Sequence, residues 1–138
     1  MSIILRYFWV FIFLFSGCEA RDSSQFLIGN WISTNMQLSQ RTQLTIEKNG
    51  KFSIFNISSK AICEAKTDEL TSGIGTWEYD QVGRKLILAF EDFSKKSCTA
   101  PYGANAFVDR GIFVEKIIFY PDGPDAPQSL VALIKQDK

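Results

Sequence analysis

The chain of 138 residues contains no histidine, which removes several chemistries at once. Serine and cysteine catalysis that uses a histidine base, histidine-ligated metals and histidine pH switches are all excluded. An excess of either charge is also missing, because 15 basic residues balance 15 acidic ones and the formal net charge is +0. A nucleic-acid binder needs surplus Lys and Arg to displace counterions, so we expect no nucleic-acid partner.

Long apolar runs are absent as well. The run from Tyr7 to Phe15 has nine residues, whereas a membrane-spanning helix needs about 20. A short run behind the single positive charge of Arg6 is typical of a secretory signal, and we predict a signal peptide over residues 1–17.

The segment Leu14-Phe15-Ser16-Gly17-Cys18 follows, with two small residues before a cysteine. It resembles the lipobox of bacterial lipoproteins. The resemblance implies cleavage before Cys18 and anchoring in the membrane by acyl chains, palmitate among them, on that residue. Because Glu19, not Asp, follows Cys18, it also implies an outer-membrane location facing the periplasm. An ordinary cleaved signal with an incidental cysteine is the alternative. Residues 18–25 are polar and are predicted to be a lipidated tether.

Two further cysteines, Cys63 and Cys98, form an even pair in an exported chain. We predict a structural disulfide that staples two loops and closes a ring of about 36 residues, worth about 4 kcal/mol on the chain-entropy model. The alternatives are a redox pair or a metal site. The chain has no C-x-x-C spacing, and two thiolates alone do not fill a zinc site, so we expect no metal.

Short runs rich in β-branched and aromatic residues, separated by turn signals, dominate the rest of the chain. Asn49-Gly50 is a strong hairpin signal, and residues 92–110 are predicted to be a long loop carrying Cys98. The predicted strands lie within Phe26–Leu38 (after a short helical turn), Thr42–Lys48, Lys51–Ile57, Ala61–Leu70, Gly73–Tyr79, Arg84–Glu91, Gly111–Tyr120 and Ser129–Lys135. We therefore predict an all-β domain over residues 26–138, an antiparallel meander of seven or eight strands that hides its edges by closing into a small barrel.

Two G-x-W motifs, Gly29-Asn30-Trp31 and Gly75-Thr76-Trp77, are each followed by a hairpin pattern. The pattern over Ile28–Phe90 resembles the lipocalin-like domains of small bacterial lipoproteins. The resemblance implies that Trp31 closes one end of the barrel against a basic residue of the last strand, for which Lys135 is the candidate. From the residues themselves, core packing is the favoured interpretation of both tryptophans, with ligand contact as the alternative.

No catalytic constellation is recognisable. Ser58-Ser59-Lys60 lacks the S-x-x-K spacing, the acidic residues are scattered, and Asp122 to Asp125 offers too few ligands for calcium. We expect a non-enzymatic protein without a cofactor. Three functions remain: a binder of a small apolar or amphipathic ligand, a protein-binding inhibitor or immunity protein of the envelope, and an envelope structural or assembly factor. An apolar cavity of a few hundred Å³ would favour the ligand, and a filled barrel would favour a protein partner.

Overall fold

In a computed structural model, residues 23–34, 41–126 and 129–137 are described. The predicted signal peptide, Cys18 and Glu19 lie outside the described residues. The described chain forms one short 3₁₀-helix, one short α-helix and eight strands: η3 (Gln25–Leu27), β1 (Gly29–Ser33), β2 (Gln43–Ile46), β3 (Lys51–Ser58), α1 (Ser59–Ile62), β4 (Leu70–Asp80), β5 (Lys85–Phe93), β6 (Tyr102–Arg110), β7 (Glu115–Phe119) and β8 (Val131–Lys135).

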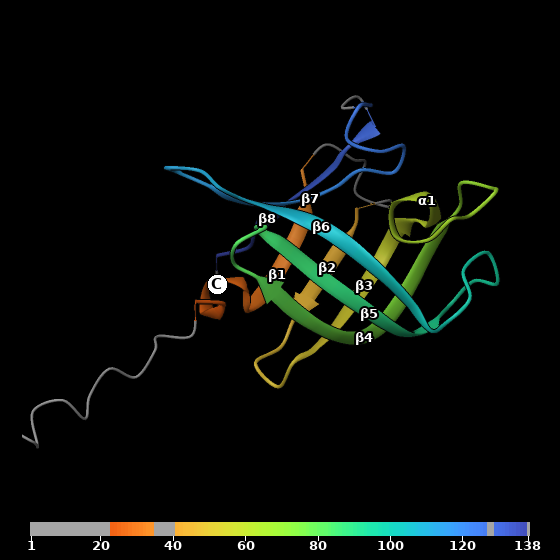
Figure 1. Cartoon of the computed structure of the whole chain (residues 1–138), viewed down its shortest axis with the longest axis horizontal. Coiled ribbons are helices and arrows are strands. Elements are labelled where there is room, and N and C mark those ends of the chain that lie inside the picture. Colours follow the sequence, from red (N-terminus) through yellow and green to blue (C-terminus); the bar gives the residue numbers. More distant parts are fainter. Residues whose placement is uncertain (1–22, 35–40, 127–128, 138) are drawn as a thin grey trace, which may run out of the picture.

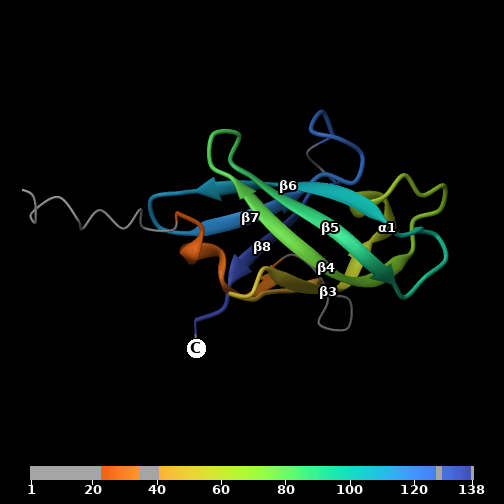
Figure 2. The same cartoon turned by 60° about the horizontal axis from the view of Figure 1, so that its bottom comes forward.

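The eight strands form a closed barrel in sequence order, and each is antiparallel to its neighbours. Figure 1 shows the strands wrapped around a common interior, and Figure 2 shows the same barrel from a second direction. Closure occurs where β1 pairs with β8, with Trp31 directly opposite Lys135. The predicted all-β meander barrel is confirmed. Closure leaves no unpaired sheet edge between β1 and β8, which is the reason a meander of this length closes.

Side chains alternate between the interior and solvent along each strand, as a pleated strand requires. The inward set on β5 is Leu86, Leu88 and Phe90, all buried. Large and small residues complement one another across the interior. Gly73 on β4 lies beneath the Phe90 ring, where a Cβ atom would approach to 2.7 Å, and Phe52 meets Phe90 edge-to-face at 5.0 Å between ring centroids.

The segment Ala61–Leu70, predicted as an irregular strand, instead contains the end of α1 and a loop, and β4 begins at its last residue, Leu70. The Ser59 hydroxyl organises that loop: it donates to the carbonyl of Thr67 at 2.8 Å and accepts from the backbone N–H of Glu69 at 3.2 Å. The prediction was wrong because Ser59 satisfies backbone groups that a strand partner would otherwise have paired.

The long loop predicted over Asp92–Arg110 is also wrong. β5 continues to Phe93, β6 occupies Tyr102–Arg110, and only the residues between them form a loop. The inward residues of β6 are Ala104, Ala106 and Val108. The two alanines are buried, but their small side chains give only a weak hydrophobic alternation in the sequence.

The last two strands are shorter than predicted. β7 begins at Glu115 and ends at Phe119, and residues 111–114 form the turn that precedes it. β8 begins at Val131, two residues after the predicted start at Ser129. In both cases the predicted strand includes residues that lie before the observed one, because composition does not show where the hydrogen-bond ladder begins.

The up-and-down strand order gives the barrel two different ends. The proximal end carries η3, the β2–β3, β4–β5 and β6–β7 turns and the last residues of β8. The distal end carries α1 and the β3–β4, β5–β6 and β7–β8 connections. In Figures 1 and 2 the proximal end is on the left and α1 is on the right.

Candidate binding surfaces

Trp31 lies in the core near the proximal end and has no exposed surface. Its indole Nε1–H donates to the carbonyl of Leu27 at 2.8 Å. The Lys135 ammonium lies 5.7 Å from the indole centroid and donates to the carbonyl of Phe26 at 2.6 Å. Gly29 has φ +134°, and a Cβ there would come within 3.0 Å of the Lys135 side chain. Gly29, Trp31 and Lys135 thus form one packed group that joins η3 to the β1–β8 seam.

Gly75 and Trp77 lie apart from that group, on β4, and Trp77 is partly buried. The Trp77 indole N–H donates to the carbonyl of Glu47 at 2.9 Å, and its backbone N–H donates to the carbonyl of Gly50 at 2.9 Å. Trp77 therefore fastens the β2–β3 turn to the barrel. The structure does not bring the five G-x-W and lysine residues into a single site.

The barrel lumen is filled by side chains. A lumen that could admit a ligand would leave accessible surface on the side chains that line it. Yet the largest fully buried residues come from most of the barrel strands and from the elements that cover its ends: Trp31, Phe90, Phe119, Leu27, Leu44, Ile46, Ile54, Ile57, Ile62, Leu86, Leu88 and Ile117. Barrels of eight strands are narrow enough to be filled in this way.

Cys63 and Cys98 form a disulfide at the distal end, with their Cα atoms 5.9 Å apart. Cys63 follows α1 directly, and Cys98 lies in the β5–β6 connection. The predicted disulfide between Cys63 and Cys98 is confirmed. The bond links the end of α1 covalently to the β5–β6 connection.

Removing this bond is expected to lower the free energy of unfolding by about 4 kcal/mol. The bond closes a loop of about 36 residues in the unfolded chain and so lowers that chain's conformational entropy. Cys63→Ala/Cys98→Ala and the oxidised parent would be compared by denaturant unfolding. Reductant should lower the free energy of unfolding of the parent to that of the double variant and should leave the value of the variant unchanged. A difference below about 1 kcal/mol would contradict a stabilising role.

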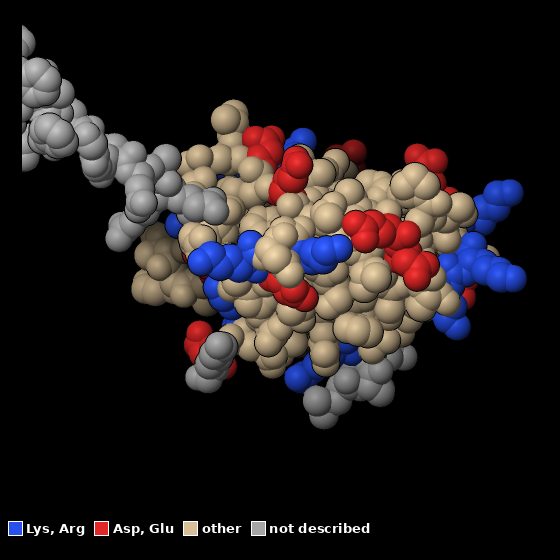
Figure 3. Space-filling view, turned by 90° about the horizontal axis from the view of Figure 1, so that it is seen from below, with Lys and Arg blue, Asp and Glu red and all other residues tan. Residues whose placement is uncertain are grey.

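Apolar side chains also lie on the outer surface, toward the distal ends of β3, β4 and β5. Phe55 is 51% exposed and Ile74 is 50% exposed, and with Phe93 they line a hollow of about 190 Å³. A second hollow of about 530 Å³ shares Asp92, Phe93 and Ser94 with it and continues onto the β5–β6 connection, past Lys95 and Lys96. We call Phe55, Ile74, Phe93, Lys95 and Lys96 the distal patch. Figure 3 shows basic side chains extending from the distal end, on the right.

The distal patch was not predicted from the sequence, although a signal for it was present. Phe55 lies on the same face of its strand as Ser53, opposite Phe52 and Ile54. A large apolar residue on the solvent face of a half-buried strand is the pattern that marks an interaction surface.

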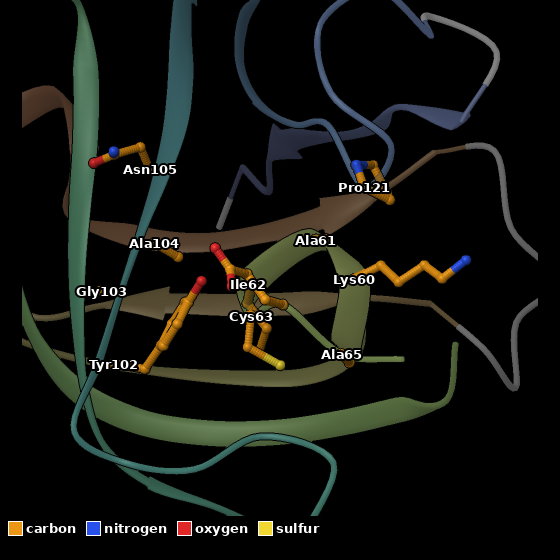
Figure 4. Close-up of a pocket in the computed structure, with 11 residues that line it drawn as sticks. Lys60, Ala61, Ile62, Cys63, Ala65, Tyr102, Gly103, Ala104, Asn105 and Pro121 are labelled. Carbon is orange, nitrogen blue, oxygen red and sulfur yellow. The ribbon is translucent and has the colours of Figure 1, made fainter. Parts of the chain in front are cut away.

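A separate hollow of about 370 Å³ opens between α1 and β6. Its lining includes Lys60, Ile62, Tyr102, Asn105 and Pro121. Figure 4 shows the Tyr102 ring pointing toward α1 and the Lys60 side chain extending away from Tyr102. The hollow is open to solvent, and its lining mixes polar and apolar groups.

Within residues 23–34, 41–126 and 129–137, no group of three or more Cys, Asp or Glu side chains is placed to hold a metal ion. The described part of the chain has no helix with the length and apolar character needed to cross a membrane. Comparisons of the chain with protein-family models, curated proteins and solved structures found no match.

Proposed function

We propose that this chain is a lipid-anchored, non-enzymatic protein of the bacterial envelope whose barrel binds another protein through the distal patch. The filled lumen is the observation that carries the choice of a protein over a ligand held inside the barrel. An apolar centre of Phe55, Ile74 and Phe93 beside the charged Lys95 and Lys96 has the arrangement of a protein interface, with an apolar core and a polar rim. A partner surface with an apolar projection flanked by carboxylates would fit it.

The anchor in this proposal rests on the lipobox resemblance and on an arrangement that agrees with it. The described chain begins at Ser23 on the proximal end, so an anchor at Cys18 leaves the distal patch directed away from the membrane. An inhibitor or immunity protein of the envelope would need its contact surface in that position.

Replacing Cys18 tests the anchor. The full-length Cys18→Ala chain is expected to lose the mass of the acyl chains and to leave the membrane fraction, because two or three chains are needed for stable anchoring. Intact mass spectrometry and membrane flotation provide the measurements. Cys63→Ala/Cys98→Ala is the matched control, since it also replaces cysteines but should remain acylated. Acylation that survives in Cys18→Ala would overturn the anchor.

Native mass spectrometry of the protein, gently extracted from its own envelope, tests the partner. We expect a stoichiometric protein complex that disappears in Ile74→Asp, because a carboxylate in the centre of an interface is left unpaired on binding. Lys116→Glu is the control: Lys116 is exposed on β7, four strands away from β3 around the barrel. Ile74 is 50% exposed and Lys116 is exposed on the outer face of the barrel, so the melting temperature should change little in either variant. A complex that survives Ile74→Asp, or the absence of any complex, would reject the proposal.

A small-molecule binder is the second candidate, favoured by the hollow between α1 and β6. Its volume of about 370 Å³ lies within the range of ligand sites, about 300–1,000 Å³. Tyr102 and Asn105 would suit an amphipathic molecule. A small adduct that dissociates on activation in the same mass spectra, without a protein partner, would favour this candidate.

A further inference from the structure

The β6–β7 turn is unusual because apolar residues occupy its most exposed positions. Ile112 and Phe113 are each 95% exposed, and Val114 next to them is about half exposed. Turns between antiparallel strands ordinarily carry Gly, Asn, Asp or Ser, which satisfy the turn geometry and tolerate water. Nothing in the described chain covers these side chains, so their exposure to water needs another explanation.

A neighbouring turn at the same end of the barrel carries another exposed apolar residue. Val82, in the β4–β5 turn, is 97% exposed. Gln81 and Arg84 from that turn share a hollow with Arg110 at the end of β6 and Gly111 of the β6–β7 turn, so the two turns are neighbours. Figures 1 and 2 both show the two turns projecting at the proximal end. We call Val82, Ile112, Phe113 and Val114 the proximal tip.

The tether leaves the barrel beside this tip. The Ser23 hydroxyl donates to the Gln81 side-chain oxygen at 3.1 Å, which places the first described residue next to the β4–β5 turn. Five residue steps separate Ser23 from Cys18, and a fully extended chain of that length spans about 17 Å. An acylated Cys18 would therefore hold the proximal end at the lipid surface.

We propose that the proximal tip inserts into the membrane interface and fixes the barrel upright on the lipid surface, with the distal patch outward. This inference rests on the proposed lipid anchor. The occupant is the lipid of the same leaflet that holds Cys18. Apolar turn residues of this size are expected to enter about 5–10 Å, to the boundary between headgroups and acyl chains.

Charges around the tip do not favour an anionic surface over a neutral one. Arg110 pairs with Glu115 at 3.8 Å and its guanidinium lies 4.3 Å from the Phe26 ring centroid. Asp80 and Arg84 border the same β4–β5 turn. Insertion is therefore driven by apolar area, and zwitterionic lipid should suffice.

The test uses the full acylated chain, reconstituted into phosphatidylcholine vesicles whose upper acyl chains carry bromine, a short-range quencher of tryptophan. In Phe113→Trp, we expect bromine to roughly halve the added tryptophan emission, measured as the difference from the parent protein, because the indole reaches the acyl boundary. Thr99→Trp, at an exposed position of the distal end, is the matched control and should be unaffected. Phe113 is almost fully exposed, so the substitution should not alter folding, which circular dichroism would verify.

Two failures can be told apart. If intact mass shows no acylation or the protein does not float with the vesicles, the proposed anchor fails. If the protein is acylated and floats, but the Phe113→Trp emission is no more quenched than that of Thr99→Trp, the anchor stands and tip insertion is overturned. Strong and equal quenching at both positions is one form of this outcome, and it would mean that the barrel lies on its side.

Discussion

Gly75→Ala is expected to lower the free energy of unfolding by about 5 kcal/mol or more, a large part of the stability of a domain this size. An alanine Cβ at position 75 would overlap the carbonyl oxygen of Ala89 and lie 3.0 Å from the Phe52 ring. The first obstacle is backbone on the neighbouring strand, which no rotamer change relieves. The two strands would have to separate where their register already shifts, between Ile74 and Gly75.

Gly103→Ala is the control for this prediction. Gly103 also lies in a barrel strand, but the nearest atom to its added Cβ is 3.9 Å away, an ordinary contact. Its effect should be within about 0.5 kcal/mol and could favour the folded state, because alanine restricts the unfolded chain. Denaturant unfolding of both variants supplies the comparison. Equal stabilities for Gly75→Ala and Gly103→Ala would show that the close approach to Ala89 does not constrain the fold.

The sequence predicted the barrel because hydrophobic alternation and turn chemistry are local signals. The Asn49-Gly50 turn and the alternation on either side correctly predicted the pairing of β2 with β3. The β6 strand was not predicted because its inward residues include Ala104 and Ala106, whose small side chains give only a weak hydrophobic alternation. Local pattern cannot indicate how much space a distant side chain fills.

The candidate surfaces were harder to predict than the fold. The disulfide followed from cysteine parity and from the exported character of the chain. The distal patch combines residues from three strands and the β5–β6 connection, and its apolar centre forms only because the barrel places Phe55 beside Ile74 and Phe93. The proximal tip has a plainer sequence signal, the run Ile112-Phe113-Val114, but the sequence pattern predicts that these residues belong to a strand. Only their position in a turn shows that water surrounds them.

Trp31→Ala is expected to lower the free energy of unfolding by about 5 kcal/mol. Truncating a fully buried tryptophan costs about 3–5 kcal/mol in lost transfer energy and cavity formation. The variant also removes the indole N–H that donates to the Leu27 carbonyl at 2.8 Å, and the loss of this hydrogen bond to a buried acceptor adds about 1 kcal/mol or more. Trp31 lies on β1, at the seam where the barrel closes, so neighbouring strands cannot collapse into the space without disturbing closure.

A graded series separates packing from hydrogen bonding at this seam. Trp31→Phe keeps most of the buried ring but loses the N–H donor, so we expect about 2 kcal/mol. Trp77→Ala should cost less than Trp31→Ala, because Trp77 is only partly buried and fastens a turn, not the seam. Chemical denaturation ranks the three variants, and near-ultraviolet circular dichroism reports whether the remaining aromatic core stays ordered. If Trp77→Ala proved as damaging as Trp31→Ala, the β2–β3 turn would be as important to barrel closure as the β1–β8 seam. If Trp31→Phe matched Trp31→Ala, the hydrogen bond to Leu27, and not the filling of the barrel end, would be what holds η3 in place.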